Sequence, residues 1–406
     1  MPRGLRLLTL ATCTVSWCLG DDAQCELSPF NTCKLKVGIV GGGTSLISLF
    51  HNISIGVGNT RRIVAGATHA KPERSLANAK MGGFTGYGHW KEMLDAWRKG
   101  EQDLDYVVIL ARSTEHYEPT KAFVEAGLAV FCEKPMTMTA AEAEEIQKLA
   151  EAKKVPFVMG HAQAGHPILM FARELVRSGA IGEVRKIESW FNQDWAAEAP
   201  GPSWRFDPKM SGIASCASNI GLDAYSLATW VSGRDVTRVS ARLKSFEPSR
   251  ELDESCSVMA ELDNGGTALI MASFISVGFK NEHGLRIFGS KGSLEWGAGT
   301  SGVLIVRHLA NAIKVYTHAG NQTEFPESIR AYPLDANLAN LHITMEREIR
   351  SRRGEKGPAA YPYPDALQGV QAMRYLEAAV ESSKQNNAWV DVKAAAGTAT
   401  RKSSWF

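Results

Sequence analysis

One lysine of this chain stands where its amine could take part in a reaction. Glu133-Lys134-Pro135 directly follows residues 128–132, an apolar run typical of a strand buried on both faces. At the carboxyl end of a parallel strand, a side chain faces the crevice in which open α/β sheets bind their ligands. There Lys134 could polarise a carbinol oxygen or accept its proton. A surface turn with a solvated amine is the competing interpretation.

A glycine-rich turn supplies the second part of a possible redox site. Residues 37–40 read as a buried strand, and Gly41-Gly42-Gly43-Thr44-Ser45 leads from it into a helical pattern. Such glycines let the backbone approach a pyrophosphate, and the following helix N-terminus favours its negative charge. Position 46 is Leu46, so the third glycine of the full fingerprint is missing and an ordinary turn stays possible. Together with Lys134, the turn predicts nicotinamide-dependent redox chemistry.

Alternating strand and helix patterns predict the sheet that would position these residues. Continuous apolar strands are expected at 36–40, 63–67, 105–111, 128–132 and 155–159. Helices are expected between them, including 116–126 and one from a Thr139–Glu142 capping box to residue 153. The helix after the first strand carries a largely apolar surface of Leu46, Ile47, Leu49, Phe50 and Ile53. Strand, helix, strand is the pattern of a parallel sheet, so residues 34–160 are predicted to form a Rossmann NAD(P)-binding domain.

Residues 161–400 change to a pattern of successive strands. Alternating runs occur at 183–190, 236–246, 255–262, 267–276, 285–288 and 293–296, with a hairpin signal at Asn264-Gly265-Gly266. One helix at 220–231 interrupts them, and helices return at 337–350 and 363–382. Strands without helices between them form antiparallel sheets. The fold class is therefore α/β: a Rossmann domain followed by an α+β domain with a large, mainly antiparallel open sheet.

Composition excludes several function classes. The chain has 406 residues, 44% of them hydrophobic and 22% charged, which fits a two-domain globular enzyme. A net charge of +2 gives no reason to expect nucleic acid, and no apolar run is long enough for a membrane span. No Cys/His spacing suggests a metal site.

The first 33 residues are predicted to be an extension or a targeting segment. Arg3 and Arg6 precede a mildly apolar run at 7–19, which resembles a secretory signal although several threonines dilute it. Because nicotinamide cofactors are scarce outside cells, we favour the cytoplasm, and export stays open if this segment is a signal peptide. Cys132, Cys216 and Cys256 are expected to be buried free thiols.

In combination, these residues resemble the Gfo/Idh/MocA oxidoreductase family, the glucose–fructose oxidoreductase and inositol dehydrogenase group. The resemblance covers residues 34–392 and rests on five segments: Val40–Gly43, Glu133-Lys134-Pro135, Gln193-Asp194-Trp195, Trp204 to Gly212, and Phe288–Trp296. It implies oxidation of a CH–OH group of a sugar, sugar derivative or inositol, with hydride transfer to nicotinamide. It also implies that Lys134 has a functional role.

The chain departs from the family pattern at two places. Ala111-Arg112-Ser113 stands where relatives usually have Thr-Pro-Asn, although His116 stands where expected. At the start of the interrupting helix, Asn219 replaces the usual aspartate and Asp223 the usual acid/base histidine. These changes weaken the inference about proton transfer and leave the predicted fold untouched.

We expect Lys134, Asp223 and His161 to be the catalytic candidates. An aspartate has a reference pKa near ~3.9 and is a weak base unless it is desolvated. Asp223 is therefore either a proton acceptor or only a first-turn carboxylate favoured by the helix dipole. His161, after the last strand of the sheet, would face the crevice or serve as a structural histidine.

The sequence also predicts the two binding sites. Trp190 shares a strand face with Asn192 and Asp194, and these could form the floor of a sugar site, with Trp204 and Arg205 closing over it. The tryptophans could equally be core. Asn219 could orient a hydroxyl of the substrate or only cap its helix. The predicted cofactor residues are Gly41, Gly43, Thr44, Ser45, His69, Lys71, Arg74, Ala111, Arg112, Ser113, His116, Glu133 and Lys134. No acid stands near His69 to bind a ribose hydroxyl. Lys71 and Arg74 could meet a 2′-phosphate or be only solvated charges at a helix start. NAD(P) is therefore expected, with a slight preference for NADP.

Two other functions stay open. The nicotinamide could be reduced only transiently while a glycoside is cleaved by elimination, or the altered residues could mark a redox-silent sugar- or dinucleotide-binding regulator. The expected partner is a small carbohydrate or polyol. Apolar residues at 269–274 and 277–279 could form an exposed sheet face, and hence a homo-oligomer through the C-terminal sheet.

Overall fold

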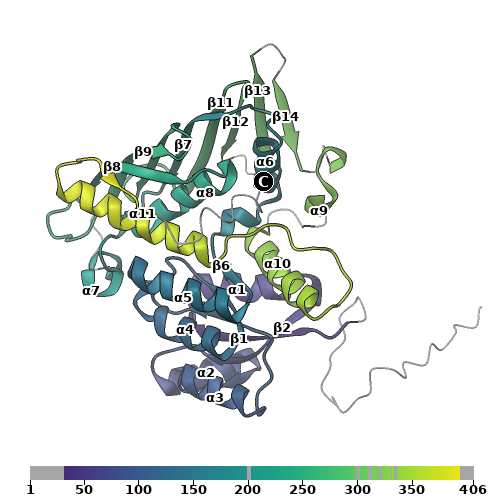
Figure 1. Cartoon of the computed structure of the whole chain (residues 1–406). Helices are drawn as coiled ribbons and strands as arrows, with labels where there is room; N and C mark the ends of the chain where they lie inside the picture. Colours follow the sequence, from purple (N-terminus) through teal and green to yellow (C-terminus); the bar gives the residue numbers. More distant parts are fainter. Residues whose placement is uncertain are drawn as a thin grey trace, which may run out of the picture.

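The computed structural model describes residues 32–198, 203–297, 299, 302–309, 313–318, 320, 322–330, 332 and 336–393. Within these residues the chain forms two sheets, one from each half (Figure 1). The predicted N-terminal segment lies almost wholly outside the described residues. In the described part of the chain, no helix is both long and apolar enough to cross a membrane.

The first sheet is parallel and six-stranded, in the order β3-β2-β1-β4-β5-β6. Its strands are β1 (Leu35–Gly41), β2 (Arg61–Ala67), β3 (Thr85–Gly86), β4 (Tyr106–Leu110), β5 (Ala129–Cys132) and β6 (Phe157–Met159). Its helices are α1 (Leu46–Gly56), α2 (Pro72–Gly82), α3 (Trp90–Arg98), α4 (Tyr117–Ala126) and α5 (Ala140–Lys153). The strand order reverses direction at β1, so the crevice at the carboxyl ends of β1 and β4 is the expected ligand site.

The second sheet has nine strands in the order β14-β13-β12-β11-β7-β10-β9-β8-β15. Its strands are β7 (Val184–Asn192), β8 (Val236–Lys244), β9 (Ser255–Leu262), β10 (Thr267–Ser273), β11 (Glu282–Gly289), β12 (Gly292–Gly297), β13 (Val303–His308), β14 (Lys314–Thr317) and β15 (Val390–Asp391). Neighbours pair antiparallel except β7 and β10, which are parallel. The predicted mainly antiparallel sheet is therefore confirmed, with one parallel pair inside it.

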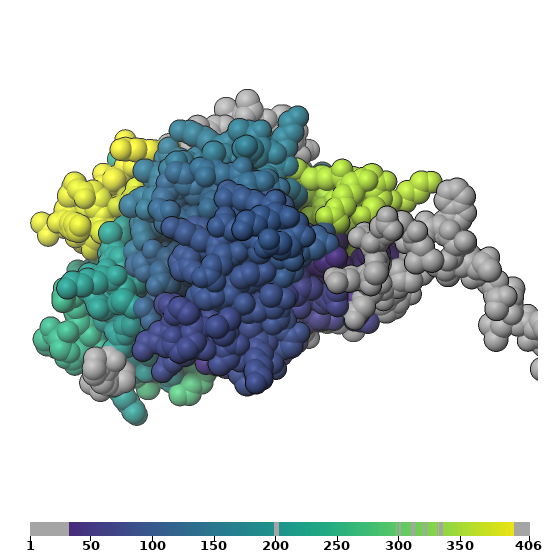
Figure 2. All heavy atoms as spheres, turned by 90° about the horizontal axis from the view of Figure 1, so that it is seen from below, coloured from purple at the N-terminus to yellow at the C-terminus, as the bar shows by residue number. Residues whose placement is uncertain are grey.

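Helices of the second half cover one face of that sheet and reach back to the first. They are α6 (Pro167–Arg177), α7 (Pro208–Ser211), α8 (Leu222–Ser232), α9 (Glu327–Arg330), α10 (Asn337–Arg352) and α11 (Ala366–Lys384). Figure 1 shows α11 between the two sheets, and it packs against both β8 and α5. From below, in Figure 2, the first-sheet unit fills the centre of the molecule. The two halves therefore share a packed interface.

Several local predictions are confirmed by the backbone. Thr139 and Glu142 form both hydrogen bonds of the capping box that opens α5. Gly265 has a φ of 81°, as the Asn264-Gly265-Gly266 turn between β9 and β10 requires. Cys132, Cys216 and Cys256 are free and buried, whereas Cys33 is disulfide-bonded.

Candidate active site

The glycine turn after β1 has the backbone that a phosphate cradle needs. Gly41, Gly42 and Gly43 have φ values of 78°, 82° and 51°, a region that favours glycine. A Cβ on Gly41 would lie 2.4 Å from the backbone of Ala111 at the end of β4, so only glycine fits there. Ser45 caps α1 by accepting a hydrogen bond from the Ser48 N–H. The turn and the exposed start of α1 therefore fit a dinucleotide pyrophosphate.

The end of β2 carries the residues predicted to meet the adenosine ribose. His69 lies beside Gly43, and its Nδ1 accepts a hydrogen bond of 2.9 Å from the Lys71 N–H. Lys71 precedes α2 and Arg74 lies in its first turn, and both are exposed. Within the described residues neither side chain has an ion-pair partner, so both cations are available to an anionic ligand beside the glycine turn.

The end of β4 brings a buried histidine against the lysine turn. His116 has Nδ1 2.7 Å from the Pro135 carbonyl oxygen and Nε2 2.9 Å from that of Ala111. Burial lowers the pKa of His116 although both carbonyls favour its protonation. Whichever ring nitrogen carries the N–H donates to one of these carbonyl oxygens, so His116 braces the ends of β4 and β5 instead of presenting a donor to a ligand. Arg112 and Ser113, just before it, stay accessible.

Lys134 reaches from the end of β5 to the helix region of the second half. Its Nζ donates hydrogen bonds to Asp223 Oδ2 at 2.8 Å, Asn219 Oδ1 at 3.0 Å and the Asn219 carbonyl oxygen at 2.8 Å. The side chains of Lys134 and Asp223 are only 15% and 17% exposed. Asn219 and Asp223, the second of the two departures found in the sequence, are therefore the residues that bind Lys134.

A short π-helix, Ala217–Gly221, carries Asn219 and leads directly into α8, whose first turn carries Asp223. π-Helices are rare in proteins, and those that occur are often found at functional sites. Its start is held by Asp253, whose carboxylate accepts the N–H groups of Ser215 at 2.6 Å and Ala217 at 2.8 Å. Burial raises the pKa of Asp223, although the charge of Lys134 acts in the opposite direction. A carboxylate in this environment is a better base than a solvated aspartate.

His161 lies close to the Lys134 cluster. Its ring is buried, and its Nδ1 is 3.0 Å from Ser226 Oγ on α8. Burial and then the charge of Lys134 lower the pKa of His161 to about 4. His161 is therefore neutral near pH 7, and it orders α8 through Ser226.

The structure does not bring Asn192 and Asp194 to this cluster. On β7, Ser189 Oγ donates to the Ala224 carbonyl oxygen at 2.8 Å, so the face of β7 that carries Ser189 looks toward α8. Side chains alternate along a strand, so Asn192 lies on the opposite face, where its Nδ2 donates to Glu282 Oε2 at 2.7 Å. Asp194 is bound instead by Lys280, which lowers the pKa of this carboxyl. These contacts do not support the predicted role of Asn192 and Asp194 as the floor of a sugar site. The alternation of side chains along the strand indicated that these residues share a face, but it could not indicate which face of the sheet that is.

Trp204 and Arg205 lie in a loop that packs over the first-sheet unit. The short helix η4 (Trp204–Phe206) contacts α7, and α7 contacts η2 (Ser113–Glu115) at the end of β4. The Arg205 guanidinium stacks between Trp204, at 4.6 Å, and Trp195, at 5.5 Å. Within the described part of the chain it has neither an ion-pair nor a side-chain hydrogen-bond partner, and burial lowers the pKa of Arg205. Its N–H donors are available to a bound molecule.

Sequence reasoning missed several buried polar residues of this region. Glu133, expected at the cofactor, turns its carboxylate inward, and Oε1 lies 2.9 Å from His51 Nε2 on α1. His283 is buried and stacked on Phe191, with both ring nitrogens unpartnered in the described structure. The sequence feature that could have revealed these residues is a histidine within an otherwise apolar helix or strand. Among the described residues there is no group of His, Cys, Asp and Glu that could hold a metal ion.

Comparison with known proteins finds two family models that match successive parts of the chain. Residues 35–161 match the model of the GFO_IDH_MocA oxidoreductase family with an NAD-binding Rossmann fold. Residues 169–295 match the model of the GFO/IDH/MocA C-terminal domain.

Individual relatives extend over nearly the whole chain. An uncharacterized oxidoreductase of Bacillus subtilis is 27% identical over 88% of this chain and 97% of its own. The levoglucosan dehydrogenase of Pseudarthrobacter phenanthrenivorans is 23% identical over 88% of this chain and 98% of its own. The crystal structure of an oxidoreductase from Sinorhizobium meliloti is 28% identical, has a TM-score of 0.79, and matches over 88% of this chain and all of that one. An inositol dehydrogenase homolog from Azotobacter vinelandii, complexed with NAD+, has a TM-score of 0.80 at 24% identity over 88% of this chain and 97% of that one, and so shows the shared fold.

Proposed function

Because this chain belongs to the Gfo/Idh/MocA oxidoreductase family, we propose that it is an NAD(P)-dependent dehydrogenase that oxidises a CH–OH group of a sugar, sugar derivative or polyol. The family supplies the oxidoreductase class and the NAD-binding fold. The substrate class and the residue roles are our proposal.

The observation that carries the proposal is the Lys134 ammonium, ion-paired with Asp223 and bound to Asn219 at the carboxyl edge of the first sheet. A carbinol oxygen entering this cluster could replace one acceptor of the ammonium. Lys134 would then stabilise the negative charge that develops on this oxygen as its proton is removed, before the departing hydride converts the alkoxide into a carbonyl. Asn219 would orient the same hydroxyl.

Asp223 is the group that we propose as proton acceptor. It lies 2.8 Å from Lys134 and its pKa is raised by burial, which improves a carboxylate as a base. His161, with its pKa of about 4, would stay neutral and act by holding α8 through Ser226. This division replaces the usual histidine with a lysine–aspartate pair.

The residues present fit a nicotinamide dinucleotide. We propose that Gly41, Gly43, Thr44 and Ser45 hold the pyrophosphate, and that Ala111, Arg112 and Ser113 line the path toward Lys134, where backbone contacts of Glu133 would also lie. The bound nicotinamide supplies the hydride acceptor. Lys71, Arg74 and His69 would meet a 2′-phosphate, which supports NADP over NAD.

The opposite wall of the site is assigned to Trp204 and Arg205. Aromatic faces stack on the CH faces of sugars, and the unpaired Arg205 guanidinium offers donors to hydroxyl or carboxylate oxygens. Asn192 and Asp194 are left out of this assignment because their partners are Glu282 and Lys280.

A panel of sugars, inositols and glycosides, tested with NAD and NADP, separates the possible functions. The proposal expects net reduced cofactor with at least one free sugar or polyol. Glycoside cleavage without net reduced cofactor would favour redox-assisted elimination. Sugar or dinucleotide binding without any turnover would favour a regulator, and the ion pair of Lys134 with Asp223 speaks against that outcome.

A further inference from the structure

Four buried polar side chains form a hydrogen-bonded chain behind the lysine turn. Glu133 Oε1 lies 2.9 Å from His51 Nε2, and His51 Nδ1 lies 3.0 Å from His342 Nε2. His342 Nδ1 lies 3.0 Å from the hydroxyl of Tyr106. His51, His342 and Tyr106 are 0% exposed and Glu133 is 8% exposed. The chain links β5, α1, α10 and β4, and so it ties the second half of the molecule to the turn that carries Lys134.

The charge of Glu133 sets the direction of the first hydrogen bond. Burial raises the pKa of Glu133, but hydrogen bonding and charge from His51, with the charge of Lys134, bring it below its usual range. An ionised carboxylate needs a donor, so His51 presents Nε2–H to it. Burial, aided by the charges of His51 and Arg61, holds the pKa of His342 well below its usual range.

One arrangement of single N–H groups on the two imidazoles gives Glu133 its donor and satisfies every member. Burial raises the pKa of Tyr106, which keeps its hydroxyl proton. Tyr106 then donates to Nδ1 of His342, Nε2–H of His342 donates to Nδ1 of His51, and Nε2–H of His51 donates to Glu133. All three bonds point toward the carboxylate. Such a chain is stiff because no member can turn without leaving a buried polar group unpaired.

Glu133 passes this constraint to the backbone of Lys134. Its second oxygen, Oε2, accepts the N–H of Lys134 at 3.2 Å. Its other side is closed by Gly160, where a Cβ would lie 2.5 Å from Oε1. The carboxylate therefore has one position, and the start of the lysine turn is held to it while Lys134 Nζ reaches Asn219 and Asp223.

We propose that Tyr106, His342 and His51 act through Glu133 as positioning residues that hold Lys134 where its ammonium can stabilise the reacting oxygen. The inference rests on the proposed dehydrogenase function. It assigns to α10, far from Lys134 in sequence, a part in setting the geometry of the reacting centre. Several charged or titratable groups lie around the chain. Near Glu133 they are Lys134, Asp223, Cys132, His116 and His161. Arg61 lies near His342, and Arg61, Glu346 and Asp105 lie near Tyr106.

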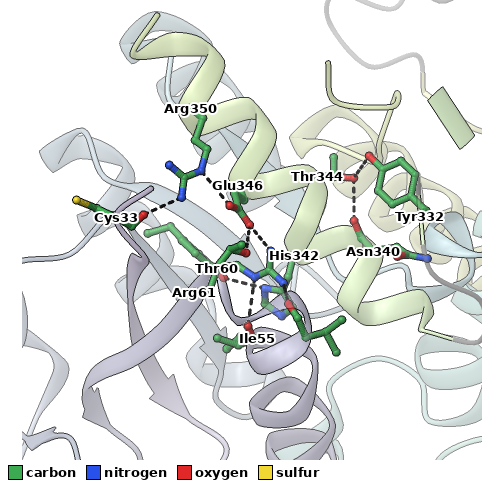
Figure 3. A network of polar contacts seen from close by, with 12 residues as sticks. Cys33, Ile55, Thr60, Arg61, Tyr332, Asn340, His342, Thr344, Glu346 and Arg350 are labelled. Carbon is green, nitrogen blue, oxygen red and sulfur yellow. Dashed lines mark hydrogen bonds and ion pairs between the residues drawn. The ribbon is translucent and has the colours of Figure 1, made fainter. Parts of the chain in front are cut away.

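Helix α10 also offers a matched control. Thr344 lies on the same helix as His342 and is likewise buried and hydrogen-bonded, to the Tyr332 hydroxyl at 3.0 Å and the Asn340 carbonyl oxygen at 2.9 Å (Figure 3). Its bonds do not join the chain to Glu133. Thr344→Val therefore removes a comparable number of buried hydrogen bonds from α10 without touching Lys134.

The test compares His342→Phe, Tyr106→Phe and Thr344→Val in the full chain. Phenylalanine at 342 keeps the ring stacked on Phe131 and removes both nitrogens. Because misplacement of a catalytic group by an ångström can cost about 100-fold, we expect kcat to fall about 10- to 100-fold in His342→Phe and less in Tyr106→Phe. KM for the cofactor should change less than about 2-fold, and the acidic limb of the pH–rate profile should move. His342→Gln, which can still donate and accept, should recover part of the rate.

Hydrogen exchange of the peptide that contains residues 133–139 gives a readout that needs no substrate. Exchange should be faster in His342→Phe and Tyr106→Phe and unchanged in Thr344→Val. The proposal is overturned if exchange stays as in the wild type in both chain variants, or if Thr344→Val slows turnover as much as they do. Absence of any turnover in the wild type, with the expected exchange pattern, would instead count against the dehydrogenase function alone.

Discussion

At the scale of single residues, the candidate site is built around a largely buried ion pair. Lys134 and Asp223 hold one another at 2.8 Å, and Asn219 offers two acceptors to the same ammonium. A pair that is largely shielded from water can respond strongly to charge that develops beside it. The account therefore assigns oxygen stabilisation to the lysine and proton uptake to the aspartate.

Lys134→Met should abolish turnover and leave cofactor binding nearly intact. The contribution of the ammonium appears only as charge develops on oxygen, and loss of one such donor typically costs on the order of 100-fold or more. Initial rates and calorimetric titration with NAD(P) measure the two effects. Loss of binding together with activity would show that Lys134 serves the cofactor instead.

Asp223→Asn should slow the reaction and remove the acidic limb of the rate profile. The carboxylate must be ionised to accept a proton, and burial raises the pKa of Asp223, so the wild-type rate should fall as pH drops through that raised value. The asparagine variant has no group to titrate there. If Asp223→Asn keeps both the wild-type rate and the acidic limb of the pH–rate profile, Asp223 does not accept the proton and only stabilises the start of α8.

Lys71→Glu should weaken NADP binding more than NAD binding. Lys71 is exposed at the end of β2, where a 2′-phosphate would lie, and the added carboxylate would repel that phosphate. Paired titrations of both nucleotides test this. Equal losses would place the lysine away from the ribose.

At the scale of elements, the reactive pair depends on how α8 begins. Asp253 accepts the N–H groups of Ser215 and Ala217 and so holds the start of the π-helix that carries Asn219. Burial raises the pKa of Asp253 to about 6, although these N–H groups act in the opposite direction. The Asp253 carboxyl group therefore binds a proton more tightly in the folded state than in the unfolded state.

Asp253→Ala should lower the free energy of unfolding by about 1–3 kcal/mol, since two buried N–H groups lose their acceptor. The folded pKa is raised, so the stabilisation by Asp253 is fully present below the unfolded pKa and declines as pH rises through about 6. Urea denaturation at pH 5 and pH 8 should thus show the larger loss at pH 5. A loss that grows with pH would contradict the sign of this shift.

Helices and strands with a clear hydrophobic period were predictable from the sequence. Which of their faces is buried was not predictable. The glycine turn, the capping box of α5 and the order of strands around Lys134 follow from local patterns, and all are found. In α1, however, Leu46, Leu49, Phe50 and Ile53 are 50–71% exposed, while Ser48, His51 and Ser54 are buried. The buried face of α1 is set by α10, which lies nearly three hundred residues later, and no local pattern reports that contact.

For the candidate site, likewise, residues within motifs were predictable from the sequence and their tertiary contacts were not. Lys134, Asn219 and Asp223 could be named because each stands at a recognisable motif. The wrong face of β7 was chosen for Asn192, because alternation is symmetric and only the packing of α8 distinguishes its two sides. His51 and His342 were missed because their meeting depends on tertiary contact alone.

At the scale of the whole molecule, the nine-stranded sheet has an open face. Met259 on β9 and Met271 on β10 are 51% and 39% exposed, and Val277 and Phe279 in the next loop are 79% and 49% exposed. Contiguous exposed apolar residues commonly mark an interface. We propose that the protein forms a homo-oligomer through this face.

Met271→Glu with Met259→Glu should reduce the mass in solution to that of one chain. Two carboxylates on each copy would face one another across the interface and lose hydration there. Light scattering at matched concentration measures the mass, and a thermal melt checks that the fold is kept. If the double variant keeps the mass of the wild-type oligomer, the subunits contact one another through another surface. If the wild-type protein is itself a monomer, the proposal is wrong.

The central claim is that hydride leaves a carbinol carbon of the substrate for the nicotinamide and stays there when the product is released. The most direct measurement uses the best substrate of the panel, deuterated at that carbon, and follows deuterium by mass spectrometry of cofactor and product. The account predicts reduced cofactor that carries the deuterium in proportion to the oxidised product. Product formed while the deuterium returns to it, with no net reduced cofactor, would contradict the account and favour transient oxidation.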